Sequence, residues 1–548
     1  MGFDENGFLA RFPGLTHVQS LSLAVVLLDC LFIVLGYVGM ERYWKDISWT
    51  DCGDDTSMYG CTPYFPYALD AGVSRRDVPR SWCACSTDPY ARSTARPRVV
   101  RSAVAVAFLV ALGLPSGARA REVTGPCATV MDPNNAPSTD PRIEHIFVAG
   151  IHVNVLLPPR YHQEHGRRYP VLYLFHGAFS DEDSFSTQTN LLSFTASQPE
   201  HLQAIVVMPD GSRLPAGRDW VDGAHPQETF VIKTLLPYID AHYRTLDDGG
   251  HRAGAGFSGG AMNAAVYAAR HPELFAAVGS FSGFLDPYDP TGIDIVQEFV
   301  SYDDDLCGGT IAPYDIWGDP DVHPMGWIGH DPVYLARSLH DISVYISSAN
   351  GVPCDDQGDP DPFLVFAESA VYAMSLSFDQ ALTEAGVAHT TRFRRCGIHQ
   401  FSNSNQGLAE FWPQMFEAFG RRRLHPFDYR TGDASASAWD WSFDVPAGRA
   451  PEFLDITGAS AHGLSLTGSG TVRVTTAPLF GKREPVVVSG LGDQPITLHA
   501  DDAGRIFFDV TLEAPHALEE YTAAERSAEA ADPRYFATRS VVFSRSPR

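Results

Sequence analysis

Short apolar segments alternate with longer amphipathic segments between residues 142 and 420. The apolar segments are rich in Val, Ile, Leu and Tyr, and they are residues 143–148, 151–157, 169–175, 204–208, 253–257, 275–281, 342–347 and 390–394. The amphipathic, helix-like segments are 228–243, 260–271, 364–385 and 406–419. This alternation predicts a largely parallel sheet covered by helices on both faces. A short turn joins the first two segments, which predicts an antiparallel hairpin at the sheet edge.

The pattern changes to period two after residue 424. Apolar and polar residues alternate, with Gly-rich turns between the segments, in 439–445, 464–467, 471–475, 485–489, 496–499 and 506–512. This pattern predicts a separate, small all-β sandwich domain at 425–518. Residues 519–548 are polar, and we expect them to form a C-terminal tail that is partly helical or loose.

Two apolar segments near the N-terminus lead to different predictions. Residues 21–40 have the length of a membrane span, although Asp29 interrupts them. Residues 99–120 combine basic residues just upstream, a short apolar core and an A-x-A pattern ending at Ala120, which is typical of a secretory signal peptide. We therefore expect a secreted or cell-envelope protein, with a catalytic domain at 121–424 and with residues 1–98 as a wrongly extended reading frame. The alternative is a membrane anchor at 21–40.

Acidic residues exceed basic ones by a wide margin. The chain has 548 residues, 66 of them Asp or Glu against 40 Lys or Arg, and a formal charge of −26. Nucleic-acid binding requires concentrated positive charge, so the composition argues against a nucleic-acid partner.

Four of the nine cysteines follow residue 120: Cys127, Cys307, Cys354 and Cys396. Their spacing does not resemble a zinc site, and an even number suits two disulfides in an oxidising compartment. Cys354 and Cys396 follow neighbouring strands at the same edge of the expected sheet. We therefore expect a Cys354–Cys396 bond, which leaves Cys127 to pair with Cys307.

The segment Gly256-Phe-Ser258-Gly-Gly260 has the G-x-S-x-G spacing of a nucleophile elbow. It lies between the apolar strand 253–257 and the helical segment that follows. Glycines on both sides allow strand and helix to approach closely, so that the serine hydroxyl points into the cleft. The sequence therefore predicts an α/β-hydrolase fold with Ser258 as nucleophile.

An oxyanion hole and a base are expected at other strand ends. The N–H of Gly259, directly after the nucleophile, is one expected donor, and the N–H of Ala178, in the loop after the strand at 169–175, is the second. The base must follow the nucleophile in the chain. His399 comes just after the strand at 390–394, where this fold presents its histidine.

Several carboxylates could orient that histidine. Asp355, Asp356 and Asp359 lie in a polar loop after the strand at 342–347. Asp361 stands before a proline and fits the N-cap of the next helix. Glu368 lies in a mostly apolar helical segment, where a buried carboxylate needs a partner such as an imidazolium.

The elbow segment resembles the esterase D group of hydrolases. More narrowly, it is similar to the secreted mycolyltransferases of mycolic-acid actinobacteria, which are fibronectin-binding antigens. The resemblance covers about residues 142–420, and it is carried by the elbow, by the histidine segment and by the stretches His271-Pro-Glu-Leu-Phe275, Ser280-Phe-Ser-Gly283, Trp317-Gly-Asp-Pro320 and Asp331-Pro332. It implies Glu368 as the acid, because these transferases carry a glutamate in the matching helix.

Two segments depart from the transferase pattern. Where those enzymes have Asp-Gly-Leu-Arg, with the Asp and Arg associated with a sugar acceptor, this chain has His176-Gly-Ala-Phe179. After the histidine, Gln400-Phe-Ser replaces Ser-Trp and further aromatic residues. These differences favour an ordinary esterase over a trehalose acyltransferase.

We therefore expect a serine carboxylic-ester hydrolase that forms an acyl-enzyme on Ser258 and uses no metal or cofactor. Its partners would be an ester or acyl-lipid substrate. One alternative is transfer of the acyl group, which would be mycolyl-like, to a sugar or glycerol hydroxyl. Another is an inactive cell-wall or matrix binding protein on a hydrolase scaffold. The β domain is expected to contact the cell wall or to serve as a structural lid.

Overall fold

The computed structural model describes residues 137–545, apart from residues 212, 308–311, 313, 358–359, 422–425, 446–447 and 533. The expected signal peptide, the alternative anchor and Cys127 lie outside the described residues, so these expectations stay predictions. Within the described part of the chain, no helix combines the length and the apolar character that crossing a bilayer requires.

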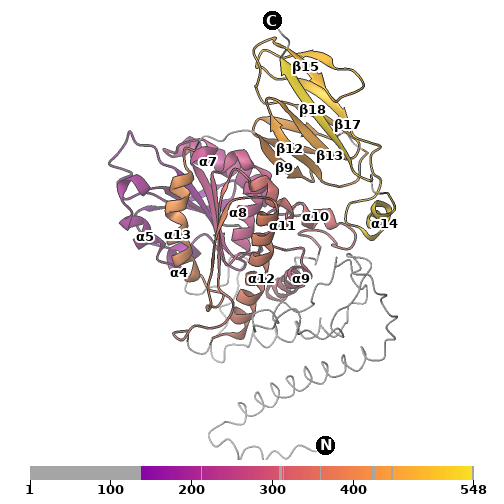
Figure 1. Cartoon of the computed structure of the whole chain (residues 1–548). Helices are drawn as coiled ribbons and strands as arrows, with labels where there is room; N and C mark the ends of the chain where they lie inside the picture. Colours follow the sequence, from indigo (N-terminus) through magenta and orange to yellow (C-terminus); the bar gives the residue numbers. More distant parts are fainter. Residues whose placement is uncertain are drawn as a thin grey trace, which may run out of the picture. The chain divides into compact units, whose positions relative to one another are not determined.

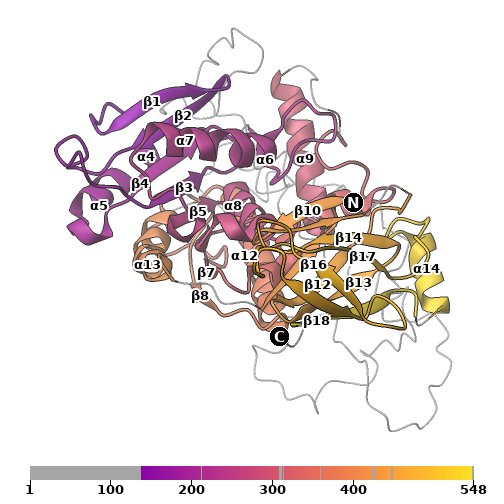
Figure 2. The same ribbon diagram turned by 90° about the horizontal axis from the view of Figure 1, so that it is seen from above.

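An eight-stranded sheet forms the centre of the first domain, in the order β1-β2-β4-β3-β5-β6-β7-β8 (Figure 2). Strands β3 to β8 run parallel, whereas β2 is antiparallel to both β1 and β4. The prediction of a mostly parallel sheet with an antiparallel hairpin at its edge is therefore confirmed. The strands are β1 Ile143–Val148, β2 Ile151–Leu156, β3 Val171–Phe175, β4 Ile205–Pro209, β5 Arg252–Phe257, β6 Ala277–Phe281, β7 Ser343–Ser348 and β8 His389–Phe393.

Helices cover both faces of this sheet (Figure 1). Because side chains alternate along a strand, Leu172 and Leu174 of β3 pack with α4, α5 and α13, while Tyr173 and Phe175 pack with α7, α8 and α12. The α-helices are α4 Ser184–Gln188, α5 Leu191–Ser197, α6 Gln227–Thr229, α7 Leu236–His242, α8 Gly259–Arg270, α9 Pro290–Cys307, α10 Pro324–Ile328, α11 Pro332–Leu335, α12 Pro362–Glu384 and α13 Asn403–Ala418. A π-helical segment, Phe230–Leu235, joins α6 to α7, and short 3₁₀ turns occur at Glu200–Leu202, Gly249–His251, Pro272–Leu274 and Ala336–Leu339.

Two antiparallel sheets form the second domain. One has the order β10-β11-β14-β17 and the other β16-β15-β18-β13-β12-β9. Their inner faces share one apolar core that includes Trp441, Leu466, Val474 and Phe543. The strands are β9 Phe427–Thr431, β10 Ser435–Ala438, β11 Trp441–Asp444, β12 Leu454–Ser460, β13 Gly463–Gly468, β14 Thr471–Thr475, β15 Pro485–Ser489, β16 Ile496–His499, β17 Phe507–Thr511 and β18 Ala537–Arg545. This arrangement confirms the predicted all-β sandwich.

The expectation of a polar tail at 519–548 is wrong. A helix, α14 (Ala523–Ala531), leads into β18, which pairs with both β13 and β15 inside the larger sheet. Only Val541 and Phe543 of β18 are buried, and most of its other side chains are polar. The strand therefore gives a weak hydrophobic signal, and the sandwich extends beyond 518 to the end of β18.

Arg270, at the C-terminal end of α8, connects the two domains. Its guanidinium binds Glu228 at 2.7 Å and Asp433 of the sandwich at 2.9 Å, and its carbonyl accepts a hydrogen bond from Tyr429. Burial would raise the pKa of Glu228, but Arg270 and His271 outweigh burial and hold that pKa well below its usual range. The sandwich thus docks at the end of α8 that lies opposite Ser258.

Replacing Arg270 should destabilise the protein strongly. Arg270→Met leaves the nearly buried Glu228 carboxylate without its main partner, so the free energy of unfolding should drop by about 3–5 kcal/mol. Asp433→Asn is the matched control. The Asp433 side chain is 42% exposed, so its loss should cost about 1 kcal/mol or less. Urea unfolding measures both, and equal effects would contradict this account.

The stability of the protein should also depend on the protonation of His330. Burial, with Arg270 and Arg218 nearby, lowers the pKa of its imidazole to about 4, against roughly 6.5 in an unfolded chain. At a pH between these two pKa values, the His330 imidazole binds a proton in the unfolded state but not in the folded state. The free energy of unfolding should therefore fall by up to about 3 kcal/mol as the pH drops through this interval. Urea unfolding at about pH 7 and about pH 5 should show a smaller decrease for His330→Gln than for wild type. If the free energy of unfolding decreased equally for the variant and the wild type, His330 would contribute nothing to this pH dependence.

Candidate active site

Ser258 occupies a strained turn between β5 and α8. Its φ of 56° and ψ of −124° are unusual for a residue with a side chain. The Ser258 N–H donates to the carbonyl of Phe281, and its carbonyl accepts from Ala261 and Phe284. These bonds fix the turn and leave the side chain at the edge of a pocket. This is the geometry of a nucleophile elbow.

Two glycines make the turn sterically possible. A Cβ atom on Gly256 would lie 2.3 Å from the carbonyl carbon of Gly260. A Cβ atom on Gly260 would lie 2.1 Å from the carbonyl oxygen of Phe175. Any other residue at either position would push α8 away from β3 and β5, so the G-x-S-x-G spacing is a packing requirement here.

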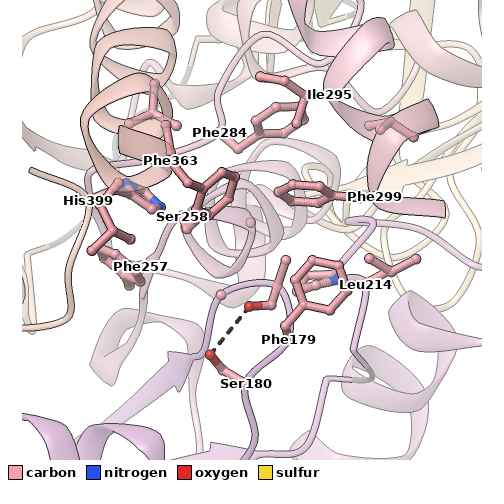
Figure 3. Close-up of a pocket in the computed structure, with 18 of the residues that line it drawn as sticks. Phe179, Ser180, Leu214, Phe257, Ser258, Phe284, Ile295, Phe299, Phe363 and His399 are labelled. Carbon is pink, nitrogen blue, oxygen red and sulfur yellow. Dashed lines mark hydrogen bonds between the residues drawn. The ribbon is translucent and has the colours of Figure 1, made fainter. Parts of the chain in front are cut away.

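His399 lies in the loop after β8 and lines the same pocket as Ser258 (Figure 3). Its ring stacks on that of Phe257, with centroids 4.6 Å apart. Its backbone N–H donates to the carbonyl of Leu364 in α12, at 2.9 Å. Packing on one side and the backbone bond on the other thus hold the imidazole beside Ser258.

The carboxylate of Glu368 in α12 is the partner of His399. Its Oε2 lies 2.8 Å from Nδ1 of the imidazole, and the side chain is fully buried. Its Oε1 accepts hydrogen bonds from the hydroxyls of Ser282 and Ser348 and from the N–H of Ala349. Four hydrogen-bonding groups offset the cost of burying this charge and fix its orientation.

The competing acids do not contact His399. Asp355 and Asp356 are exposed in the loop after β7, and Asp359 lies outside the described residues. Asp361 accepts a hydrogen bond from the N–H of Phe363, which confirms its expected role as the N-cap of α12. Among the candidates in the described part, only Glu368 reaches the imidazole.

A disulfide joins Cys354 to Cys396, as predicted. It connects the loop after β7 to the loop after β8, three residues before His399. Backbone hydrogen bonds between Gly351 and Gly397, and between Gly397 and Val352, join the same two loops. The expected pairing of Cys127 with Cys307 is not tested, because Cys127 lies outside the described residues.

The loop after β3 approaches Ser258 closely. A Cβ atom on Gly177 would lie 3.0 Å from the Cβ of Ser258. The N–H groups of Ala178 and Gly259, the expected oxyanion donors, have no acceptor among the described residues, and both residues line the pocket. They are therefore free to bind a negatively charged oxygen next to Ser258.

Two residues hold this loop in place, one through its side chain and one through its backbone. The buried His176 places Nδ1 2.8 Å from the carbonyl of Gly177, and its Nε2 accepts from the N–H of Gly211. Phe179 has a φ of 56°, and its N–H donates to the carbonyl of Arg213. In the segment His176-Gly-Ala-Phe179, His176 and Phe179 thus fix the loop through hydrogen bonds. Phe179 also places an apolar ring where the mycolyltransferases, which this chain resembles, have a charged side chain.

The pocket beside Ser258 has a volume of about 420 Å³. Most of its lining is apolar, and the described residues that line it all belong to the α/β domain. Among the described residues, the sandwich thus contributes no side chain to this pocket. The lining side chains that sequence reasoning missed are mainly Phe284 after β6 and three residues of α9, namely Ile295, Val296 and Phe299.

These omissions have different causes. Helix α9 begins with Pro-Thr-Gly and carries several acidic residues, so its helical pattern is weak, although its Ile and Val spacing was a usable signal. For Ser282, the sequence gives no signal beyond its position directly after β6.

Within the described part of the chain, no three His, Cys, Asp or Glu side chains gather as a metal site would require.

Residues 147–418 match a family model described as a putative esterase. The chain is 34% identical over 246 residues to the esterase Rv1288 of Mycobacterium tuberculosis, which covers 43% of this chain and 50% of that protein. It is 28% identical over 269 residues to the diacylglycerol acyltransferase/mycolyltransferase Ag85A of Mycobacterium bovis, which covers 47% of this chain and 73% of that protein. The chain thus spans about half the length of the first of these relatives.

Among solved structures, the chain is similar to MPT51 (FbpC1) of Mycobacterium tuberculosis. The match covers 50% of this chain and 98% of MPT51. The identity is 21% and the TM-score 0.42.

Replacing Glu368 should test its role as the acid. Glu368→Gln keeps the shape but removes the charge facing the imidazole, so turnover should fall at least about a hundredfold. Asp355→Asn and Asp356→Asn are matched controls in the exposed loop and should stay near wild type. Ester-hydrolysis rates, with circular dichroism to check folding, measure all three. An active Glu368→Gln beside an inactive Asp variant would place the acid in the loop.

Proposed function

Residues 147–418 match the model of an esterase family, and from this premise we propose that the domain hydrolyses carboxylic esters through an acyl-enzyme on Ser258. The observation that carries the proposal is the pairing of His399 with the buried Glu368 beside a strained serine. Serine hydroxyls are poor nucleophiles unless a positioned base removes their proton. This combination of residues is difficult to explain as packing.

In the proposed reaction, the hydroxyl oxygen of Ser258 attacks the carbonyl carbon of the ester and its proton passes to Nε2 of His399. The carbonyl oxygen becomes an oxyanion, which the N–H groups of Ala178 and Gly259 stabilise. The bond to the alcohol oxygen then breaks, and His399 gives its proton to the leaving alcohol. Water repeats the sequence on the acyl-enzyme, releasing the acid and restoring Ser258.

The buried carboxylate has a specific task in this scheme. When His399 takes the proton, its ring becomes positive in a site that excludes much of the solvent. The carboxylate of Glu368, whose far oxygen accepts hydrogen bonds from two hydroxyls and an N–H, stabilises that charge. It also holds the proton on Nδ1, which leaves Nε2 to face Ser258.

Acyl transfer to a sugar or glycerol hydroxyl is the second candidate. The similarity to the mycolyltransferase Ag85A supports it, since an alcohol could replace water in the second half of the reaction. The oxyanion loop, with Ala178 and Phe179, offers no charged side chain to an acceptor. We therefore favour hydrolysis. An assay with trehalose or glycerol present, in which acylated acceptor is quantified against free acid, distinguishes the two.

We also propose that the protein is exported. The signal-peptide pattern ending at Ala120 supports export. The disulfide between Cys354 and Cys396 fits an oxidising compartment. N-terminal sequencing of protein recovered outside the cytoplasm should then find Arg121 as the first residue, and a retained Met1 would contradict cleavage.

Replacing Ser258 should abolish catalysis without unfolding the protein. Ser258→Ala should lower ester turnover by at least about a thousandfold and abolish covalent labelling by a fluorophosphonate. Ser180→Ala, which removes another hydroxyl from the same pocket, is the control and should remain active and labelled. Mass spectrometry of labelled peptides locates the adduct. Activity of Ser258→Ala above about a tenth of wild type would rule out this nucleophile.

A further inference from the structure

The chemical character of the pocket restricts the group that it can hold. No Asp, Glu, Lys or Arg lines it among the described residues, and its polar side chains are limited to Ser180, Gln188, Ser258, His399 and Gln400. A charged group inside this space would lose its hydration and find no opposite charge. The pocket therefore suits an uncharged hydrocarbon.

The two amide side chains of the pocket and most of its apolar walls come from different elements of the fold. Gln400 directly follows His399, and Gln188 is an exposed residue of α4. The apolar walls come mainly from α9 and from the first turns of α12. The acyl chain of a bound ester would therefore extend toward α9, with its alcohol toward the amide side chains.

The volume indicates how much of an acyl group the pocket can hold. A dry protein cavity of about 150 Å³ accommodates benzene, with its six carbon atoms. A pocket of about 420 Å³ is nearly three times as large. It therefore holds roughly seventeen carbon atoms if filled completely, and the ester group occupies part of that space. An acyl group of about a dozen carbon atoms or fewer fits inside.

Phe299 lines one side of the pocket, between two other aromatic rings. Its ring lies 5.0 Å from the ring of Phe179 in the oxyanion loop and 6.4 Å from the ring of Phe363 in the first turn of α12. Figure 3 shows these three rings around the space next to Ser258. Phe299 is only partly buried, whereas its neighbours Ile295 and Val296 are buried. Phe299 is therefore a wall residue that is less tightly enclosed than its neighbours in α9.

We infer that Phe299 limits the length of the acyl group, so that the enzyme prefers esters of uncharged, medium-chain acids over those of long-chain acids. This inference rests on the proposed esterase function. A chain that is too long must displace the Phe299 ring from its contacts with Phe179 and Phe363. Truncating the ring would open the pocket and let a longer chain pass between the two remaining aromatic walls.

A series of 4-nitrophenyl esters from acetyl through butanoyl, octanoyl and dodecanoyl to hexadecanoyl tests the inference. For the wild-type protein, kcat/KM should rise to octanoyl or dodecanoyl and be at least about tenfold lower for hexadecanoyl. An octanoyl-length chain that ends in a carboxylate should react at least about tenfold more slowly than octanoyl itself, because its charge would be buried without a partner. Esters are kept below their micelle-forming concentrations.

Phe299→Ala should raise the hexadecanoyl-to-octanoyl ratio of kcat/KM by about tenfold or more. Phe299→Leu keeps an apolar side chain and should give an intermediate ratio, which covers the case in which the alanine variant folds poorly. Phe147→Ala is the control. It removes a ring that is 60% exposed on β1, outside the pocket, and should leave the ratio unchanged.

Equal use of hexadecanoyl and octanoyl esters by the wild type would overturn the inference while leaving the esterase proposal intact. So would folded Phe299→Ala and Phe299→Leu variants with the wild-type ratio. If no ester in the series is hydrolysed and a fluorophosphonate does not label Ser258, the proposed function itself fails and the inference fails with it.

Discussion

The structure of the site depends on how closely α8 approaches β3 and β5. Gly256 and Gly260 meet backbone atoms where a side chain would have no room, and this contact forces Ser258 into its strained conformation. The same contact brings the loop after β3 against Ser258, so that Ala178 and Gly259 line the same pocket as the serine. Strain of this kind costs roughly 1–3 kcal/mol and persists only where the surrounding packing enforces it. Here the sheet and α8 supply that packing.

The positions of the proposed base, His399, and the proposed acid, Glu368, are fixed in different ways. Glu368 belongs to a long helix, and His399 belongs to a loop that has no regular structure of its own. The loop is nevertheless fixed at several points, through the carbonyl of Leu364, the ring of Phe257 and the Cys354–Cys396 disulfide. The site therefore combines a carboxylate on a rigid element with an imidazole on a braced loop, which favours a preorganised geometry.

Sequence patterns predicted the parts of this protein that have a strong local signature. Buried parallel strands, the elbow spacing and an acid in an apolar helix all follow from residue types that only a few environments tolerate. The missed parts lack such a signature. The pocket wall formed by Phe299 belongs to a helix rich in acidic residues, and the contact of Ser282 with Glu368 joins residues that are 86 positions apart. Strand β18 was missed because only two of its nine side chains are buried. Long-range contacts decide these features, and no local pattern records them.

The position of β18 also determines the order in which the chain can fold. The α/β domain is complete once α13 has been synthesised, so it can form while the rest of the chain is still emerging. The sandwich cannot follow the same course, because β13 and β15 have no partner between them until the residues of β18 arrive. During that interval both strands expose unpaired edges, which other chains can bind. A ribosome that stalls late in the message would therefore release a finished α/β domain attached to an aggregation-prone half-sheet.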